Sequence, residues 1–212
     1  KQNRWLIPLD HSRLPNFEQY AGTVATDLAY DPKLTYCAVW QSGVTAIAYD
    51  ERQTDGPIDS LDALFDDKYK GKIGMLSDND ELGTAGLLAL GIDPLTSTYA
   101  DWKKAAALLT RQRDDGLGRQ YYDNSYVKAL QDGDLAVTQA YSGDIFQANN
   151  SGYPHLKFVI PKQGAVLWRD NSVIPLHAEN PVDALQWIDF YYRPEIQALI
   201  DDWVNYVSPA PA

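Results

Sequence analysis

The feature that most constrains the fold is an alternation of strand-like and helix-like patterns between residues 36 and 160. Short runs rich in Val, Ile and aromatic residues, bounded by Gly, Asp or Ser, predict strands. The segments between them carry apolar residues three and four positions apart, which is typical of helices. Because strands that alternate with helices form parallel or mixed sheets covered by helices, the pattern predicts an α/β fold.

The individual elements can be placed from these patterns and from their capping residues. Residues 1–35 are irregular, with one amphipathic segment from Pro15. The interruption at residues 41–43 leaves open whether the first run is one long bent strand or two short ones. In the helix from Thr98, we expect Trp102, Ala106 and Leu109 to face the core. The predicted strands are 36–49, 72–77, 119–122, 135–141, 156–160 and 166–170, and the predicted helices are 61–65, 78–90, 98–109, 124–130, 142–148, 180–191 and 194–200.

Length and charge narrow the class of protein. A chain of 212 residues can form one domain or two small ones. Its net charge of -11 and isoelectric point near 4.5 would repel nucleic acid and anionic membranes while weakly attracting cations. Acidic residues also simply keep a protein soluble, so charge alone does not identify a ligand.

The chain gives little sign of catalysis or membrane insertion. No apolar run approaches the roughly 18 residues of a membrane helix, and the first residues carry neither an export signal nor a lipid-attachment cysteine. The single cysteine, Cys37, lies in an apolar run and is interpreted as a small core residue. None of His11, His155 and His177 stands in a nucleophile motif. We therefore expect no catalytic residue and no cofactor.

Two pairs of residues have spacings that suit a small cation. Asp78 and Glu81 are three apart at a predicted helix start, where both can reach a common ligand. Alternatively, they cap the helix and interact favourably with the positive end of its dipole. Trp168 and Asp170 are two apart on a predicted strand and so share a face. An indole there can cover methylene groups while the carboxylate takes an ammonium. The alternative is a core Trp beside a surface Asp.

Several ordered segments together resemble the spermidine/putrescine-binding proteins, within the larger class of periplasmic-type solute-binding proteins of ABC importers. The resemblance covers nearly the whole chain and depends on the order and spacing of its pieces. These are the strand ending at 44–49, the helix 60–65 followed by 69–73, the acidic turn 78–81, Gly133-Asp134 before 141–144, Pro161–Gly164 leading to 168–171 and 174–175, the helix pair 180–194, and the exit 208–210.

The resemblance implies a fold of the type II periplasmic-binding-protein kind, with two α/β domains, mixed sheets and a ligand cleft between the domains. Residues 1–53 and 168–212 would form parts of the first lobe and residues 54–167 the second. The crossing segments would lie near 49–53 and 168–171. Relative to the family, the first domain would be incomplete, and the export signal and a C-terminal tail would be absent, so both ends look cut.

The resemblance also implies a function: capture of a polyamine such as putrescine or spermidine and its delivery to a membrane permease. It implies a periplasmic or extracellular location, with a lipid anchor through a missing N-terminus as one possibility, and no metal ion. The implied ligand residues are Asp78, Glu81, Trp168 and Asp170, with Tyr141 where the family often has Trp. Asp144 and Trp40 are weaker candidates.

Two alternatives remain open from the residues. The same fold could hold another small solute, such as an amino-acid derivative, a metal ion or an anion. An anion would require basic groups, whereas the matched positions are acidic. Alternatively, Asp78 and Glu81 could serve a hydrolase as acid and base, but such a pair must face a substrate from opposite sides. Neighbours on one helical turn do not meet that requirement.

Overall fold

The computed structural model describes residues 5–210 and divides the chain into two compact units. Unit 1 consists of residues 1–43 and 168–212, and unit 2 of Val44–Leu167. The first division falls at Gly43, upstream of the expected crossing at 49–53. The reason is that the second half of strand β1 pairs with strands of unit 2. Residues 1–4 and 211–212, which we expected in the first lobe, lie outside the described residues.

Unit 2 is built on a mixed sheet with the strand order β3-β2-β4-β1-β5. Strand β2 runs parallel to β3 and β4, whereas β1 runs antiparallel to β4 and β5. A sixth strand, β6, pairs with β1. This confirms the predicted α/β class with a mixed sheet. The strands are β1 (Ala38–Asp50), β2 (Ile73–Leu76), β3 (Gly118–Tyr122), β4 (Val137–Tyr141), β5 (Leu156–Val159) and β6 (Val166–Ser172).

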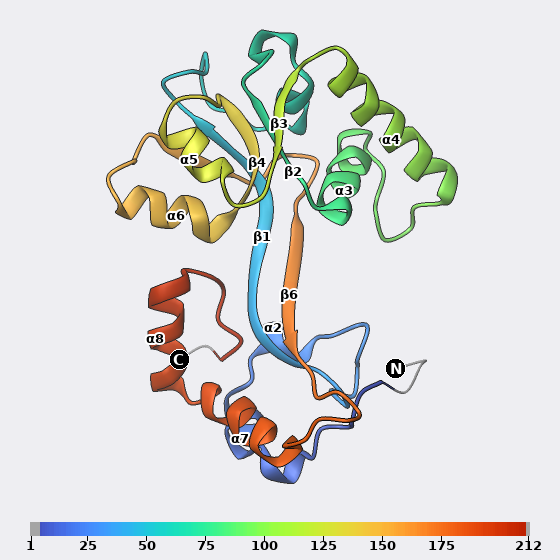
Figure 1. The fold of residues 1–212 in the computed structure, drawn as a ribbon, viewed down its shortest axis with the longest axis vertical. Coiled ribbons are helices and arrows are strands. Elements are labelled where there is room, and N and C mark those ends of the chain that lie inside the picture. The colour runs from blue at the N-terminus through green and yellow to red at the C-terminus, as the bar shows by residue number, and fades with distance from the viewer. Residues whose placement is uncertain (1–4, 211–212) are drawn as a thin grey trace. The chain divides into compact units, whose positions relative to one another are not determined.

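Helices cover both faces of this sheet (Figure 1). One face carries α3 (Asn79–Ala89), α4 (Tyr99–Asp114) and the 3-10 helices η2 (Leu61–Phe65) and η3 (Asp67–Tyr69); the other carries α5 (Tyr126–Gln131) and α6 (Ser142–Asn150). On β1, Ile47 and Tyr49 belong to the hydrophobic core beneath α3 and α4, and Ala48 belongs to the core beneath α5 and α6. Because both faces are buried, the strands read as continuous apolar runs.

Of the two alternatives for the run from Tyr36, the single long strand is confirmed: β1 is continuous from Ala38, and the interruption at residues 41–43 does not break it. The prediction for α4 needs correction. In α4 the buried residues are Ala105, Leu109 and Gln112, not Trp102 and Ala106. The buried stripe of α4 is therefore rotated around the helix relative to the predicted one. Trp102 lies at the margin of the core against Gly83.

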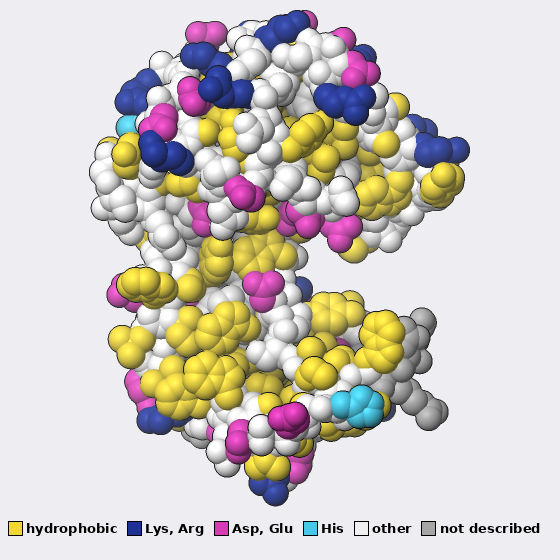
Figure 2. Space-filling model, viewed as in Figure 1, with side chains coloured by type: hydrophobic (Ala, Val, Ile, Leu, Met, Phe, Trp, Pro, Cys, Tyr) yellow, Lys and Arg dark blue, Asp and Glu magenta, His cyan; other side chains and the backbone are white. Residues whose placement is uncertain are grey.

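Unit 1 is a cluster of helices around its own core. Its elements are η1 (His11–Arg13), α1 (Pro15–Tyr20), α2 (Thr23–Thr26), α7 (Pro181–Tyr191) and α8 (Pro194–Val204). The core brings together Phe17, Tyr191 and Tyr192, and half-buried Cys37 packs against it. Hydrophobic side chains also gather on the surface over α7 and α8 (Figure 2), where Trp203 is 83% exposed.

Candidate functional site

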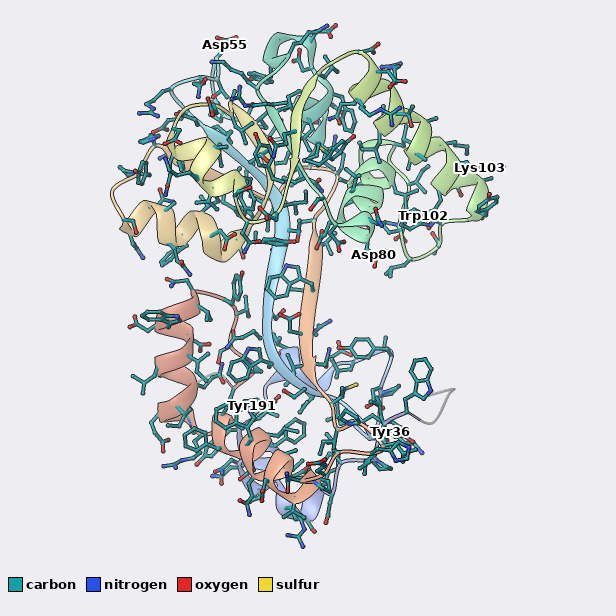
Figure 3. All side chains as sticks on the ribbon, viewed as in Figure 1. Tyr36, Asp55, Asp80, Trp102, Lys103 and Tyr191 are labelled. Atoms are coloured by element: carbon teal, nitrogen blue, oxygen red, sulfur yellow. The ribbon has the colours of Figure 1, made fainter. Side chains whose placement is uncertain are left out.

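The acidic turn predicted from the sequence lies at the carboxyl edge of the unit 2 sheet. Asp78 and Glu81 follow β2, and Tyr141 ends β4. Because β2 and β4 are parallel, their carboxyl ends meet at one edge of the sheet. In open α/β sheets this is the edge where ligands bind. Asp80, within the same turn, is labelled at the start of α3 in Figure 3.

Asp78 is the N-cap of α3. Its Oδ1 accepts hydrogen bonds from the backbone N–H of Asp80 at 2.9 Å and of Glu81 at 3.0 Å. These bonds satisfy donors that the first helical turn leaves open. Asp78 therefore caps the helix, which is one of the two roles that its position predicts. The Asp78 side chain is nevertheless exposed, so capping does not bury it.

Glu81 is held from two neighbouring strands. Its Oε1 accepts a hydrogen bond from the Thr45 hydroxyl on β1 at 2.9 Å. Its backbone oxygen accepts one from the side-chain Nε2 of Gln139 on β4 at 3.1 Å. The other carboxylate oxygen, Oε2, is buried and has no hydrogen-bond partner among residues 5–210. Glu81 thus presents one engaged and one unengaged oxygen.

The surroundings of Glu81 disfavour its charge. Burial raises the pKa of its carboxyl, and the nearby charges of Asp78 and Asp80 raise it further, while the Thr45 hydrogen bond lowers it. Within residues 5–210, no lysine or arginine forms an ion pair with these three carboxylates. Negative charge is therefore concentrated at this turn, and no lysine or arginine of the described residues pairs with it.

A small cavity of about 10 Å³ adjoins Glu81 within unit 2. It is lined mainly by uncharged side chains and glycine, namely Thr45, Ala46, Leu61, Ala85, Leu88, Gln139, Gly164, Ala165 and Val166. Such a space is close to the minimum that accommodates one water molecule. It is far too small to hold a whole polyamine.

Tyr141 and Asp144 lie at the same sheet edge but are engaged with Tyr126. The Tyr126 hydroxyl donates to Asp144 Oδ2 at 2.6 Å and accepts from the Tyr141 backbone N–H at 2.9 Å. The rings of Tyr126 and Tyr141 meet edge to face, with centroids 6.3 Å apart. Asp144 also lines a groove of about 220 Å³ with Asn124. Tyr141 is the direct cross-strand partner of Thr45, whereas Asp144 lies on α6.

In unit 1, Trp168 and Asp170 both lie on β6, as predicted. Trp168 is half-buried and Asp170 is exposed, and their spacing places both side chains on one face of the strand. The Trp168 ring meets Tyr206 edge to face, with centroids 4.9 Å apart and planes at 87°. Unit 1 thus contributes an aromatic pair beside a carboxylate.

The remaining candidate, Trp40, is weaker. Its ring packs edge to face on Tyr191 at a centroid distance of 4.7 Å, and it is partly buried against the unit 1 core. Within residues 5–210, no cluster of three or more His, Cys, Asp and Glu side chains could hold a metal ion. No helix in the same described range is long and apolar enough to cross a membrane.

Sequence reasoning missed three residues of these groups: Thr45, Gln139 and Tyr206. Thr45 and Gln139 sit inside apolar strands, where buried polar side chains require partners. That requirement was the available signal, although it does not identify the partner. Tyr206 lies just after α8 and gave no local signal beyond its aromatic ring.

Comparisons with known proteins agree with this architecture. Residues 3–212 match the model of the family described as bacterial extracellular solute-binding protein. The chain is 29% identical to the putrescine/agmatine-binding protein of Pseudomonas aeruginosa over 95% of this chain and 59% of that protein. It is 32% identical to the putrescine/cadaverine-binding protein of the same organism over 87% of this chain and 55% of that one.

Among solved structures, a spermidine/putrescine ABC transporter protein from Listeria monocytogenes is similar with a TM-score of 0.89 and 30% identity. The match covers 99% of this chain and 64% of that one. The chain thus spans less than two thirds of the length of each of these three proteins. The fold is that of the type II periplasmic binding proteins, and the chain belongs to the family of bacterial extracellular solute-binding proteins.

Proposed function

We propose that this chain carries the polyamine-binding residues of the extracytoplasmic component of an ABC importer. The ligand is a diamine or short polyamine of the putrescine type, and the partner that receives it is a membrane permease. The proposed location is periplasmic or extracellular, and a lipid anchor belongs to the same proposal. The proposed ligand contacts are Asp78, Glu81 and Tyr141 of unit 2 and Trp168 and Asp170 of unit 1.

One observation carries the proposal: the carboxylates of the α3 turn concentrate negative charge at a sheet edge, and no lysine or arginine between residues 5 and 210 forms an ion pair with them. Burial raises the pKa of Glu81, and an ammonium group would offset that cost by supplying the missing opposite charge. Polyamines also carry apolar methylenes between their charges, which aromatic faces can cover. The relatives whose names include putrescine support this choice of ligand.

The alternative ligands fit less well. An anion would meet the same three carboxylates and no basic partner for them in the described chain. A hydrolase would need acid and base on opposite sides of a substrate. Asp78 instead binds the backbone N–H of Glu81 on one helical turn. The matched relatives are named as binding proteins, and absence of catalysis is part of the proposal.

Calorimetric titration with putrescine, spermidine, spermine and sulfate tests the proposal. We expect the amines to bind and sulfate not to bind. Glu81→Gln should weaken putrescine binding by about tenfold or more, because it removes a charged partner of an ammonium. The matched control is Asp55→Asn, since Asp55 is also acidic, is exposed, and lies far from Asp80 in unit 2 (Figure 3). If sulfate binds better than the amines, or if both variants lose affinity equally, the assignment is wrong.

A further inference from the structure

Two buried polar side chains that belong to neither the acidic turn nor the helix form hydrogen bonds with Glu81. Thr45 is 3% exposed and Gln139 is 2% exposed. Both come from central strands, β1 and β4, which pair with one another. Rigid strand positions hold a functional side chain more precisely than loop positions do.

The two residues hold different parts of Glu81. The Thr45 hydroxyl donates to Oε1 of the carboxylate at 2.9 Å. Gln139 spans the turn between β2 and α3: its Oε1 accepts from the Leu76 N–H at 3.1 Å, and its Nε2 donates to the Glu81 backbone oxygen at 3.1 Å. One side chain therefore fixes the carboxylate, and the other fixes the backbone on both sides of Asp78.

We propose that Thr45 and Gln139 are positioning residues that set the placement of Glu81 for binding an ammonium group. The inference rests on the proposed function for the identity of the ligand. Within residues 5–210, Thr45 supplies the one hydrogen bond made to the Glu81 carboxylate. Gln139 supplies the one side-chain hydrogen bond to its backbone oxygen.

The charged groups that face Glu81 are few. Asp78 and Asp80 approach from its own turn, and the residues that line the adjoining cavity from the other elements are uncharged. Burial and the two aspartates raise the pKa of Glu81, and the Thr45 hydroxyl opposes them. Removal of that hydroxyl should raise the pKa further. A protonated carboxyl cannot pair with an ammonium, so binding should become more sensitive to falling pH.

Thr45→Val is the first test because valine has the shape of threonine without the donor. Thr45→Ser retains the hydroxyl, and Thr138→Val is the matched control. Thr138 is a fully buried strand residue whose hydroxyl donates to a backbone oxygen, that of Gln139. The pH titration of the Glu81 carboxyl is followed by carbon NMR without ligand, and its resonance is assigned from Glu81→Gln. Putrescine binding is then measured by calorimetry from about pH 5 to about pH 8.

We expect Thr45→Val to raise the titration midpoint of Glu81 and to weaken putrescine binding about threefold to tenfold near neutral pH. The loss should deepen as pH falls. Thr45→Ser and Thr138→Val should keep the wild-type midpoint. An unchanged midpoint in Thr45→Val, or the same change in Thr138→Val, would overturn the role of Thr45. If the wild-type chain binds no amine, the proposed function fails, while the ligand-free titration still decides the role of Thr45.

Gln139 is tested with Gln139→Met, which keeps the length of the side chain and removes both hydrogen bonds. We expect weaker putrescine binding with the fold retained by circular dichroism. Gln139→Glu should bind more weakly still, because it loses the donor to Glu81 and adds a further carboxylate, and it should raise the Glu81 midpoint. Wild-type affinity and midpoint in both variants would exclude a positioning role for Gln139.

Discussion

The indole of Trp168 lies directly against Gly43. A Cβ atom at residue 43 would stand 2.3 Å from Cζ2 of the ring, far inside van der Waals contact. The φ angle of Gly43 is not positive, so the requirement for glycine here is one of space. The neighbouring Ser42 hydroxyl donates to the Trp168 backbone oxygen at 2.6 Å. Strand β1 thus contacts both the ring and the backbone of Trp168.

Gly43→Ala should displace the indole. We expect a loss of about 1–3 kcal/mol in the free energy of unfolding, as for other overpacked sites, and weaker putrescine binding. Urea unfolding and calorimetry measure the two effects. Gly118→Ala is the control, because it also adds a methyl group to a strand glycine but meets no atom closer than 3.9 Å. Equal losses in both variants would show that space at Gly43 is not what matters.

Asp170→Asn tests whether this exposed carboxylate takes an ammonium group. The substitution removes the charge and keeps the shape, so putrescine binding should weaken about tenfold to a hundredfold, the worth of a hydrogen bond to a charged group. Asp183→Asn provides a control on the exposed first turn of α7. A change of only a few tenths of a kcal/mol in binding free energy at Asp170 would remove it from the site.

Glu81→Gln should change how stability depends on pH. Burial raises the pKa of the Glu81 carboxyl above its ordinary value of 4.5. Between pH 4.5 and the raised pKa, the folded chain binds more protons at this site than the unfolded chain, so the site loses stability as pH rises. Glutamine removes this loss. We therefore expect the variant to gain stability relative to wild type as pH rises above about 4.5, measured by urea unfolding. A gain that instead grows toward acid pH would contradict the sign.

Asp189→Ala should destabilise unit 1. From α7, the Asp189 carboxylate accepts hydrogen bonds from the backbone N–H groups of Asn16 at 2.7 Å and Phe17 at 3.2 Å, and from the Asn16 side chain at 2.6 Å. Its removal leaves the start of α1 without these acceptors, which should cost about 1–3 kcal/mol in urea unfolding. Asp183→Ala, on the same helix, should cost much less. Equal costs would show that Asp189 does not cap α1.

Much of the fold could be predicted from the sequence because strand and helix patterns depend on residues close together in the chain. The alternation from residue 36 onward predicted the α/β class and the order of the elements. The pattern also placed Trp168 and Asp170 on one strand and Asp78 at the start of a helix. Where a local pattern was ambiguous it misled: the apolar stripe of α4 was assigned to Trp102 and Ala106, whereas packing against α3 selects Ala105 and Leu109.

The sequence by itself thus determined most of the elements from residue 36 onward and which acidic and aromatic side chains stand at their ends. Only the tertiary structure decided which residues contact those side chains. Thr45 reaches Glu81, and Gly43 makes room for Trp168, because of strand pairing and packing between segments far apart in the chain. A local sequence pattern cannot predict such pairs. Its period shows on which face of a strand or helix a side chain lies, but not which residue of another segment will contact it.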